Sequence, residues 1–143
     1  MMGVLSVSGL GELSADLDHL AAIPESVVDG MLNASADVIV EAQRKEALRQ
    51  WRGKGYDTGE TAHSIKKGRV KKGKNGRSIT VSPQGTNKKG ERHAAVAFVN
   101  EYGAPGRGIR PRQAIRTATE RATDEAVAAG EKVLGDHLDK KNL

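Results

Sequence analysis

The basic side chains between residues 66 and 112 are the strongest candidates for a binding function, because many cations lie close together in this part of the chain. Residues 52–112 carry fifteen Lys or Arg against four Asp or Glu, whereas residues 1–51 carry three against eight. Clustered cations neutralise phosphates without reading sequence, with an affinity that falls steeply with salt, or they meet an acidic protein surface. The candidate set is Lys66, Lys67, Arg69, Lys71, Lys72, Lys74, Arg77, Lys88, Lys89, Arg107, Arg110 and Arg112.

Three interpretations of this basic set stay open. The cations could contact DNA phosphates, dock onto an acidic protein, or form a solvated fringe that orders only against a neighbour. Aromatic residues make up only 3% of the chain, so few rings are available to stack on bases, and sequence-specific recognition of single strands is not expected. We favour protein docking over direct contact with DNA.

No residue pattern in the sequence predicts catalysis or a metal site. The histidines His19, His63, His93 and His137 lie far apart and lack the spacing of metal ligands. The chain has no cysteine, which excludes disulfides and thiolate sites. The glycine-rich segment 103–108 does not open a helix with Lys-Ser or Lys-Thr, as a phosphate-binding loop would. We therefore expect a non-enzymatic protein without a cofactor.

The elements that must position the basic residues begin and end with helices. Apolar side chains recur with helical period over residues 24–51, which predicts a long helix with one buried stripe. A second long helix, rich in alanine, is predicted to start near Pro111, and residues 139–143 are expected to fray. A shorter amphipathic helix is predicted for residues 9–21, where leucines repeat at spacings of three and four.

A β-hairpin is predicted between the long helices. Asn75-Gly76 is typical of a tight two-residue turn, and it joins the expected strands 65–72 and 77–83. That turn places Val70 opposite Val81 and leaves the lysines of the tip to project. The loops 84–93 and 103–110 are polar or rich in Gly and Pro, and we expect both to be flexible.

Residues 94–102 are predicted to form a strand that is apolar on both faces and ends in Asn-Glu-Tyr-Gly. Such a strand needs cover on both sides, and a neighbouring copy could provide part of it. The candidate subunit-interface residues are Trp51, Tyr56, Phe98, Glu101 and Tyr102.

These elements predict an α+β fold: a small, mostly antiparallel sheet with a long N-terminal helix and a long C-terminal helix packed on one face. With 143 residues, the chain is expected to be a single domain over residues 1–143. The start of the chain lacks the pattern of a secretion signal, and the longest apolar run, residues 94–99, is too short to span a bilayer. We expect no membrane contact and a cytoplasmic site of assembly.

The ordered motifs resemble those of head–tail joining proteins of long-tailed bacteriophages, also called neck, tail-completion or minor tail components. Gly9-Leu10-Gly-Glu-Leu13 matches the start of the family, and Thr58-Gly59 with Ser64-Ile65 matches a Thr-Gly segment before its hairpin. Residues 97–103 match the Ala-x-Phe-Val-Glu-Tyr-Gly pattern, with Asn100 inserted. Residues 109–112 match the Arg-Pro loop but lack the aromatic that often follows it.

The resemblance implies a structural virion protein that forms an oligomeric ring, hexameric or dodecameric, at the neck of the particle. Its partners would be copies of itself and neighbouring neck or tail proteins, and genome DNA would pass through the ring, with possible non-specific contact. Two alternatives stay open: a tail terminator ring that caps the tail tube, and a small basic protein that binds DNA without sequence specificity.

Overall fold

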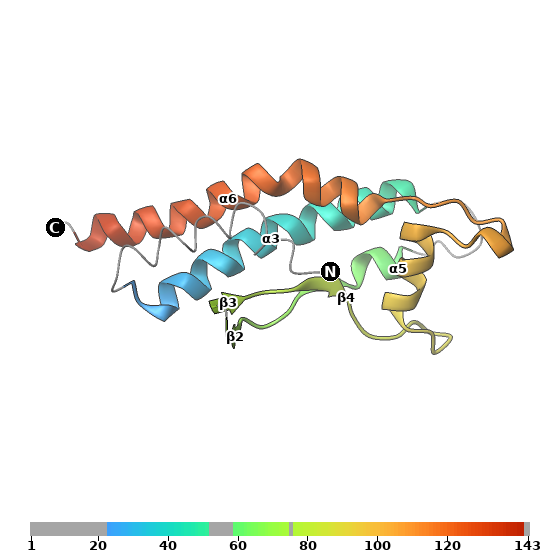
Figure 1. Ribbon diagram of the computed structural model, residues 1–143, viewed down its shortest axis with the longest axis horizontal. Helices are drawn as coiled ribbons and strands as arrows, with labels where there is room; N and C mark the ends of the chain where they lie inside the picture. The colour runs from blue at the N-terminus through green and yellow to red at the C-terminus, as the bar shows by residue number, and fades with distance from the viewer. Residues whose placement is uncertain (1–22, 52–58, 75, 142–143) are drawn as a thin grey trace. The chain divides into compact units, whose positions relative to one another are not determined.

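The computed structural model describes residues 23–51, 59–74 and 76–141 (Figure 1). The fold is α+β: two long helices, α3 (Glu25–Gln50) and α6 (Ala114–Lys141), pack together, and between them along the chain come a small antiparallel β region and the shorter helices α4 (Glu60–His63) and α5 (His93–Tyr102). The chain divides into two compact units. Of the described residues, the first unit contains 23–39, 67–74, 76–81 and 122–141, and the second contains 40–51, 59–66 and 82–121, so each unit contains part of both long helices.

In the first unit, α3 and α6 approach closely through small residues. Ser35 is buried and its hydroxyl donates a hydrogen bond of 2.7 Å to the Ala126 carbonyl. A Cβ added to Gly30 would lie 3.3 Å from a methyl group of Val133. The apolar stripes predicted for both helices are confirmed, since Met31, Ile39, Ala126 and other positions of each stripe are buried. The polar Ser35 fits this stripe because it bonds to a main-chain carbonyl of the facing helix.

The predicted hairpin forms, but its register differs from the expected one. Strand β2 (Lys71–Gly73) pairs with β3 (Gly76–Ser78) so that Gly73 lies opposite Gly76. Val70 therefore does not lie opposite Val81, and that prediction was wrong. Gly76 has a φ of 108° and is the first residue of β3, whereas the prediction used it as the second residue of the turn.

A β-bulge separates this tip from the base of the hairpin. Strands β1 (Ile65–Lys67) and β4 (Val81–Pro83) form a separate two-stranded sheet. The Gly68 N–H donates to the Thr80 carbonyl at 2.7 Å, so three steps from Gly68 to Lys71 face only two from Thr80 to Ser78. The extra residue on the first strand breaks the ladder, which is how bulges redirect strands.

The second unit contains the main correction to the sequence prediction, because residues 93–102 form helix α5 and not a strand. The run Ala94–Val99 is continuously apolar, and periodicity cannot distinguish a buried strand from a helix in so short a run. Three of its residues are alanine, the strongest helix former, and backbone bonds from the N–H groups of Ala95 and Val96 to the Arg92 carbonyl close its first turn.

Both loops beside α5 contain hydrogen-bonded turns. In the loop before the helix, the Asn87 side-chain oxygen accepts bonds of 2.9 Å from the N–H groups of Lys89 and Glu91. In the loop after it, a 3₁₀ turn, η1 (Pro105–Arg107), is enclosed by a β-bridge between Ala104 and Ile109. Helix α6 then begins at Ala114, three residues later than the predicted start near Pro111, and remains helical to Lys141. Of the helices in the described ranges, none has the length and apolar character that crossing a bilayer requires.

Candidate interaction surface on helix α5

Helix α5 buries polar residues and exposes apolar ones. Its buried positions, at four-residue spacing, are His93, Ala97 and Glu101. The His93 Nδ1 lies 3.1 Å from the Thr61 hydroxyl, which comes from α4 on the buried side of the helix. Buried polar side chains are tolerated when they are hydrogen-bonded, and His93 has its partner, Thr61, within the same unit.

Glu101, on α5, caps the start of α6 through direct hydrogen bonds. It is 4% exposed, and its two carboxylate oxygens accept bonds of 2.9 Å from the N–H groups of Ile115 and Arg116. The first N–H groups of a helix have no partner inside it, and a negative charge there also complements the helix dipole. Glu101 was predicted from the sequence to be a candidate interface residue. Its burial argues against that role, and its two hydrogen bonds make it a cap of α6.

The opposite side of α5 carries the two largest exposed aromatic side chains of the described residues. Phe98 is 62% exposed and Tyr102 is 57% exposed, and their ring centres lie 4.8 Å apart at an angle of 50°. The spacing of four residues places both rings on one side of the helix. Both were candidate interface residues in the sequence, and their exposure leaves them available to a partner.

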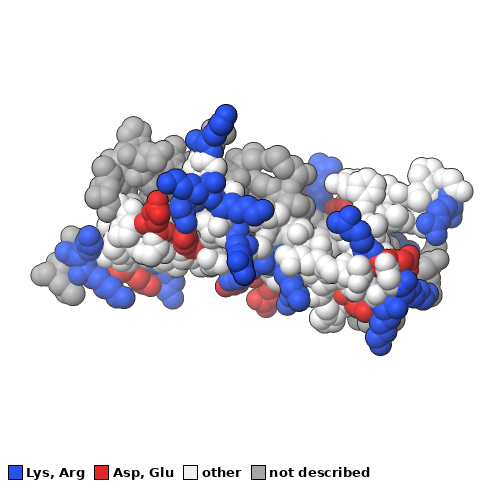
Figure 2. All heavy atoms as spheres, turned by 90° about the horizontal axis from the view of Figure 1, so that it is seen from below, with Lys and Arg blue, Asp and Glu red and all other residues white. Residues whose placement is uncertain are grey.

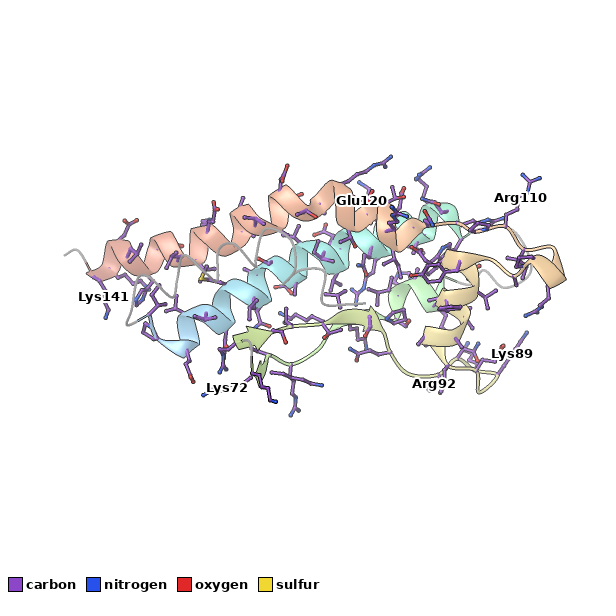
Figure 3. The ribbon with its side chains drawn as sticks, in the orientation of Figure 1. Lys72, Lys89, Arg92, Arg110, Glu120 and Lys141 are labelled. Atoms are coloured by element: carbon purple, nitrogen blue, oxygen red, sulfur yellow. The ribbon has the colours of Figure 1, made fainter. Side chains whose placement is uncertain are left out.

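A pocket of about 410 Å³ lies along the same helix in the second unit. Its apolar lining comes mainly from α5, and its charged lining residues come from both flanking loops. The lining residues are Glu91, Arg92, Ala95, Val96, Val99, Asn100, Arg107 and Ile109. In Figure 3, Arg92 and Lys89 lie at the loop that precedes α5, and Arg110 lies in the loop that leads to α6. The lining of the pocket therefore combines apolar side chains with two arginines and one glutamate.

Trp51 and Arg112 hold the second unit together. Trp51 is 7% exposed and its indole N–H donates to the Arg112 carbonyl at 3.1 Å. The Arg112 guanidinium donates to the Gln50 carbonyl at 3.1 Å, and its main-chain N–H donates to the Asn100 carbonyl at 2.8 Å. Burial removes Trp51 from the candidate interface, and these bonds give Arg112 a structural role. Tyr56, the remaining candidate, lies outside the described residues.

Two cations of the first unit bind the hairpin to α3. Arg77 donates to both carboxylate oxygens of Asp29, at 2.5 and 2.8 Å, and lies 3.6 Å from Glu25. Hydrogen bonds from Arg77 hold the pKa of Asp29 below its usual value. Lys67 lies 2.8 Å from Asp37. Arg77 and Lys67 were predicted from the sequence to face a partner, whereas in the structure both form ion pairs with α3.

The other basic candidates are exposed. Lys71, Lys72 and Lys74, here called the tip lysines, lie around the hairpin turn, and Lys72 comes within 3.8 Å of Glu25 with both side chains largely exposed. Figure 3 shows Lys72 pointing away from the ribbon. Figure 2 shows that Lys and Arg side chains gather in several groups on the face seen there. The remaining exposed candidates are Lys66, Arg69, Lys88, Lys89, Arg107 and Arg110.

One further ion pair in the second unit perturbs a pKa strongly. Hydrogen bonds from Arg49 lower the pKa of Glu46 from 4.5 to about 2, and Arg121 on α6 lies 3.7 Å from the same carboxylate. A carboxyl group whose pKa is lowered by folding stabilises the protein above its unfolded pKa, and this stabilisation is lost as the pH falls from 4.5 toward 2.

Replacing Glu46 with Gln should therefore destabilise the protein more at pH 6 than at pH 3. The expected difference is at most about 1 kcal/mol, because Arg49 is largely exposed and solvent screens the pair. Urea unfolding at both pH values measures it, with Glu41→Gln as a control on the exposed side of the same helix. An equal loss of stability at pH 6 and pH 3 would contradict the prediction.

Comparison of the chain with protein-family profiles, with curated proteins and with solved structures gives no match. Within the described residues, no group of three His, Asp or Glu side chains is placed to hold a metal ion. The resemblance to head–tail joining proteins thus remains a prediction that rests on the ordered motifs of the sequence.

Sequence reasoning missed the inverted arrangement of α5. The signal was present, since Phe98 and Tyr102 are four residues apart, as are His93, Ala97 and Glu101. On a helix these positions form two separate stripes, one aromatic and one mainly polar. The assignment of a strand concealed them, because a strand places alternate residues on opposite faces.

Proposed function

We propose that this chain is a structural virion protein of a tailed bacteriophage, a ring-forming head–tail joining or tail-completion subunit through which genome DNA passes. The observation that carries the proposal is the inverted helix α5. It exposes Phe98 and Tyr102 and lines a largely apolar pocket, while His93 and Glu101 are buried. Exposed aromatic groups are typical of surfaces that another protein covers.

Ring assembly needs two different and complementary surfaces on each subunit. The α5 surface of the second unit and the tip lysines of the first unit are chemically distinct, since one is aromatic and the other is cationic. The ordered motifs that resemble neck proteins add the biological context. In this proposal the protein is not an enzyme, its ring is hexameric or dodecameric, and its other partners are adjacent neck or tail proteins.

The proposal places the protein at the head–tail junction of the virion, after assembly in the cytoplasm of the bacterial host. The tail terminator ring that caps the tail tube is the alternative position within the same class. A second candidate function, non-specific binding of DNA, is favoured by one observation. The tip lysines are exposed around one hairpin turn, where clustered cations can neutralise phosphates.

Reversing the charge of the tip lysines, by changing Lys71, Lys72 and Lys74 together to Glu, tests both functions. If the tip docks onto a neighbouring virion protein, the yield of infectious particles should fall at least about tenfold, because six units of charge change at the contact. The variant protein should stay folded by circular dichroism, since all three side chains are exposed.

The matched control changes Lys132, Lys140 and Lys141 to Glu, which alters the net charge equally at exposed positions of α6. This control should assemble as the wild type does. Normal particle yield from the tip variant would exclude the tip as a docking element. A duplex-DNA shift that weakens with salt and disappears only in the tip variant, without any effect on particles, would favour the DNA-binding function.

A further inference from the structure

The exposed side of α5 is one continuous apolar stripe. Ala95, Phe98, Val99 and Tyr102, here called the α5 stripe, follow the spacing i, i+3, i+4 and i+7. On an α-helix these positions form a single face, the pattern by which a helix packs along another helix. Val96 lies next to this face, and with Ala95 and Val99 it lines the pocket. The surface therefore has the shape and chemistry that a second amphipathic helix would cover.

The cations around the pocket define the charge of its occupant. Arg92 and Arg107 are among its lining residues, and Glu91 is the one acidic residue of the lining. Lys88, Lys89 and Arg110 lie exposed in the loops at either side of α5. Charges at the edge of an interface select a partner of opposite sign and increase the rate of association. The occupant should combine apolar side chains at helical spacing with several carboxylates.

The chain itself contains a segment of this chemistry. Residues 10–20, which lie outside the described residues, carry Leu10, Leu13, Leu17 and Leu20 at spacings of three, four and three. The same segment carries Glu12, Asp16 and Asp18, and no Lys or Arg precedes Arg44 in the sequence. It therefore offers apolar groups to the α5 stripe and negative charge to the arginines of the pocket lining.

We propose that residues 10–20 of one copy dock on the α5 stripe of a second copy. The contact is of the helix-in-groove kind, with leucines entering the pocket and carboxylates facing Arg92 and Arg107. Because it joins two different surfaces of the same chain, it propagates from copy to copy and closes into a ring when the rotation permits. The inference deepens the proposed function and rests on it, since it assigns the contact between adjacent subunits of the ring.

Mixing two full-length variants tests the contact. The donor variant, Leu13→Asp with Leu17→Asp, has an intact α5 stripe, and the acceptor variant, Phe98→Ser with Tyr102→Ser, has an intact leading segment. Wild-type protein should form larger species with increasing concentration in sedimentation experiments, and each variant alone should self-associate at least about 30-fold more weakly. An equimolar mixture should form a one-to-one pair, because one intact donor then meets one intact acceptor.

Each alternative arrangement gives a different result, and each would overturn the proposal. A contact between two α5 stripes leaves the donor variant self-associating as strongly as the wild type, and docking of residues 10–20 on their own copy leaves the wild type monomeric at every concentration. Self-association of the wild type that neither variant weakens would place the contact elsewhere. Leu138→Ser, at the other exposed large apolar residue of the described chain, is the control and should leave the wild-type mass unchanged.

Particle assembly separates failure of this inference from failure of the proposed function. If both variants lose self-association and their mixture pairs, but phage carrying either variant assemble normally, the contact is real and the neck function is wrong. If neither variant changes self-association while the tip variant blocks particle formation, the neck function stands and the contact is wrong. The unfolding midpoint of the acceptor variant should stay near that of the wild type, because Phe98 and Tyr102 are exposed.

Discussion

Replacement of Gly103 with Ala is expected to destabilise the second unit by about 3–4 kcal/mol, the largest effect that we predict. Gly103 follows α5 with φ 77° and ψ 177°, a conformation that essentially only glycine adopts. A Cβ at this position would lie 2.7 Å from the Ile109 carbonyl oxygen and 2.7 Å from the Pro111 nitrogen. Both neighbours are main-chain atoms, so the clash cannot be relieved by a change of side-chain rotamer.

Urea unfolding measures this loss, and Gly106→Ala supplies the control within the same loop. Gly106 has no positive φ, and a Cβ there would meet nothing within 4 Å. Its substitution should change stability by less than about 0.5 kcal/mol. Because Ile109 lines the α5 pocket, Gly103→Ala should also weaken self-association of the protein. Similar stabilities for the two alanine variants would show that the Gly103 main-chain geometry is not required.

Replacement of Glu101 with Ala is expected to cost about 2–4 kcal/mol. The substitution removes two charge-assisted hydrogen bonds and leaves the N–H groups of Ile115 and Arg116 without their partner at the start of α6. Glu101→Gln should cost about half as much, because its amide oxygen can still accept one bond while its amino group cannot accept the other.

Chemical unfolding of the Ala and Gln variants gives both values. The control is Glu120→Gln on α6, where the carboxylate is 68% exposed and pairs with an exposed Arg116, so its loss should cost less than about 1 kcal/mol. A stability of Glu101→Ala equal to that of the control would mean that the buried carboxylate does not cap α6.

The long elements were predictable because their pattern extends over many turns. Helices α3 and α6 are 26 and 28 residues long, and an apolar period repeated over so many turns distinguishes a helix from a strand without tertiary information. The Gly and Pro residues between α5 and α6 likewise indicated a turn-rich connection. The fold class and the order of the long elements followed from these signals.

The short elements were not predictable in the same way. Six consecutive apolar residues satisfy a strand and a helix equally, and the choice depends on what covers them. In the structure, α4 and the start of α6 offer hydrogen-bond partners to His93 and Glu101, which helix α5 can place on one side. The hairpin was found from Asn75-Gly76, but its register followed from the bulge after Gly68 and from the main-chain conformation of Gly76.

Some features of the candidate site could also be predicted from the sequence, and others could not. Exposed cations at the hairpin tip could be listed from the sequence, because charge clustering is a local property. The roles of Arg77, Arg112 and Trp51 could not, because the groups that their side chains bond to are separated from them by 48 or more residues along the chain. The sequence does not distinguish a cation that forms an ion pair within the fold from one that is exposed to solvent.

The sequence alone determined the charge distribution, the two long helices, the hairpin and the α+β class, since each depends on local composition or on a sustained period. Only the tertiary structure decided that α5 is a helix, that its polar side is buried and that its aromatic side is exposed. The physical reason is that burial of a polar group depends on a distant hydrogen-bond partner, and the chain brings that partner close only when it folds.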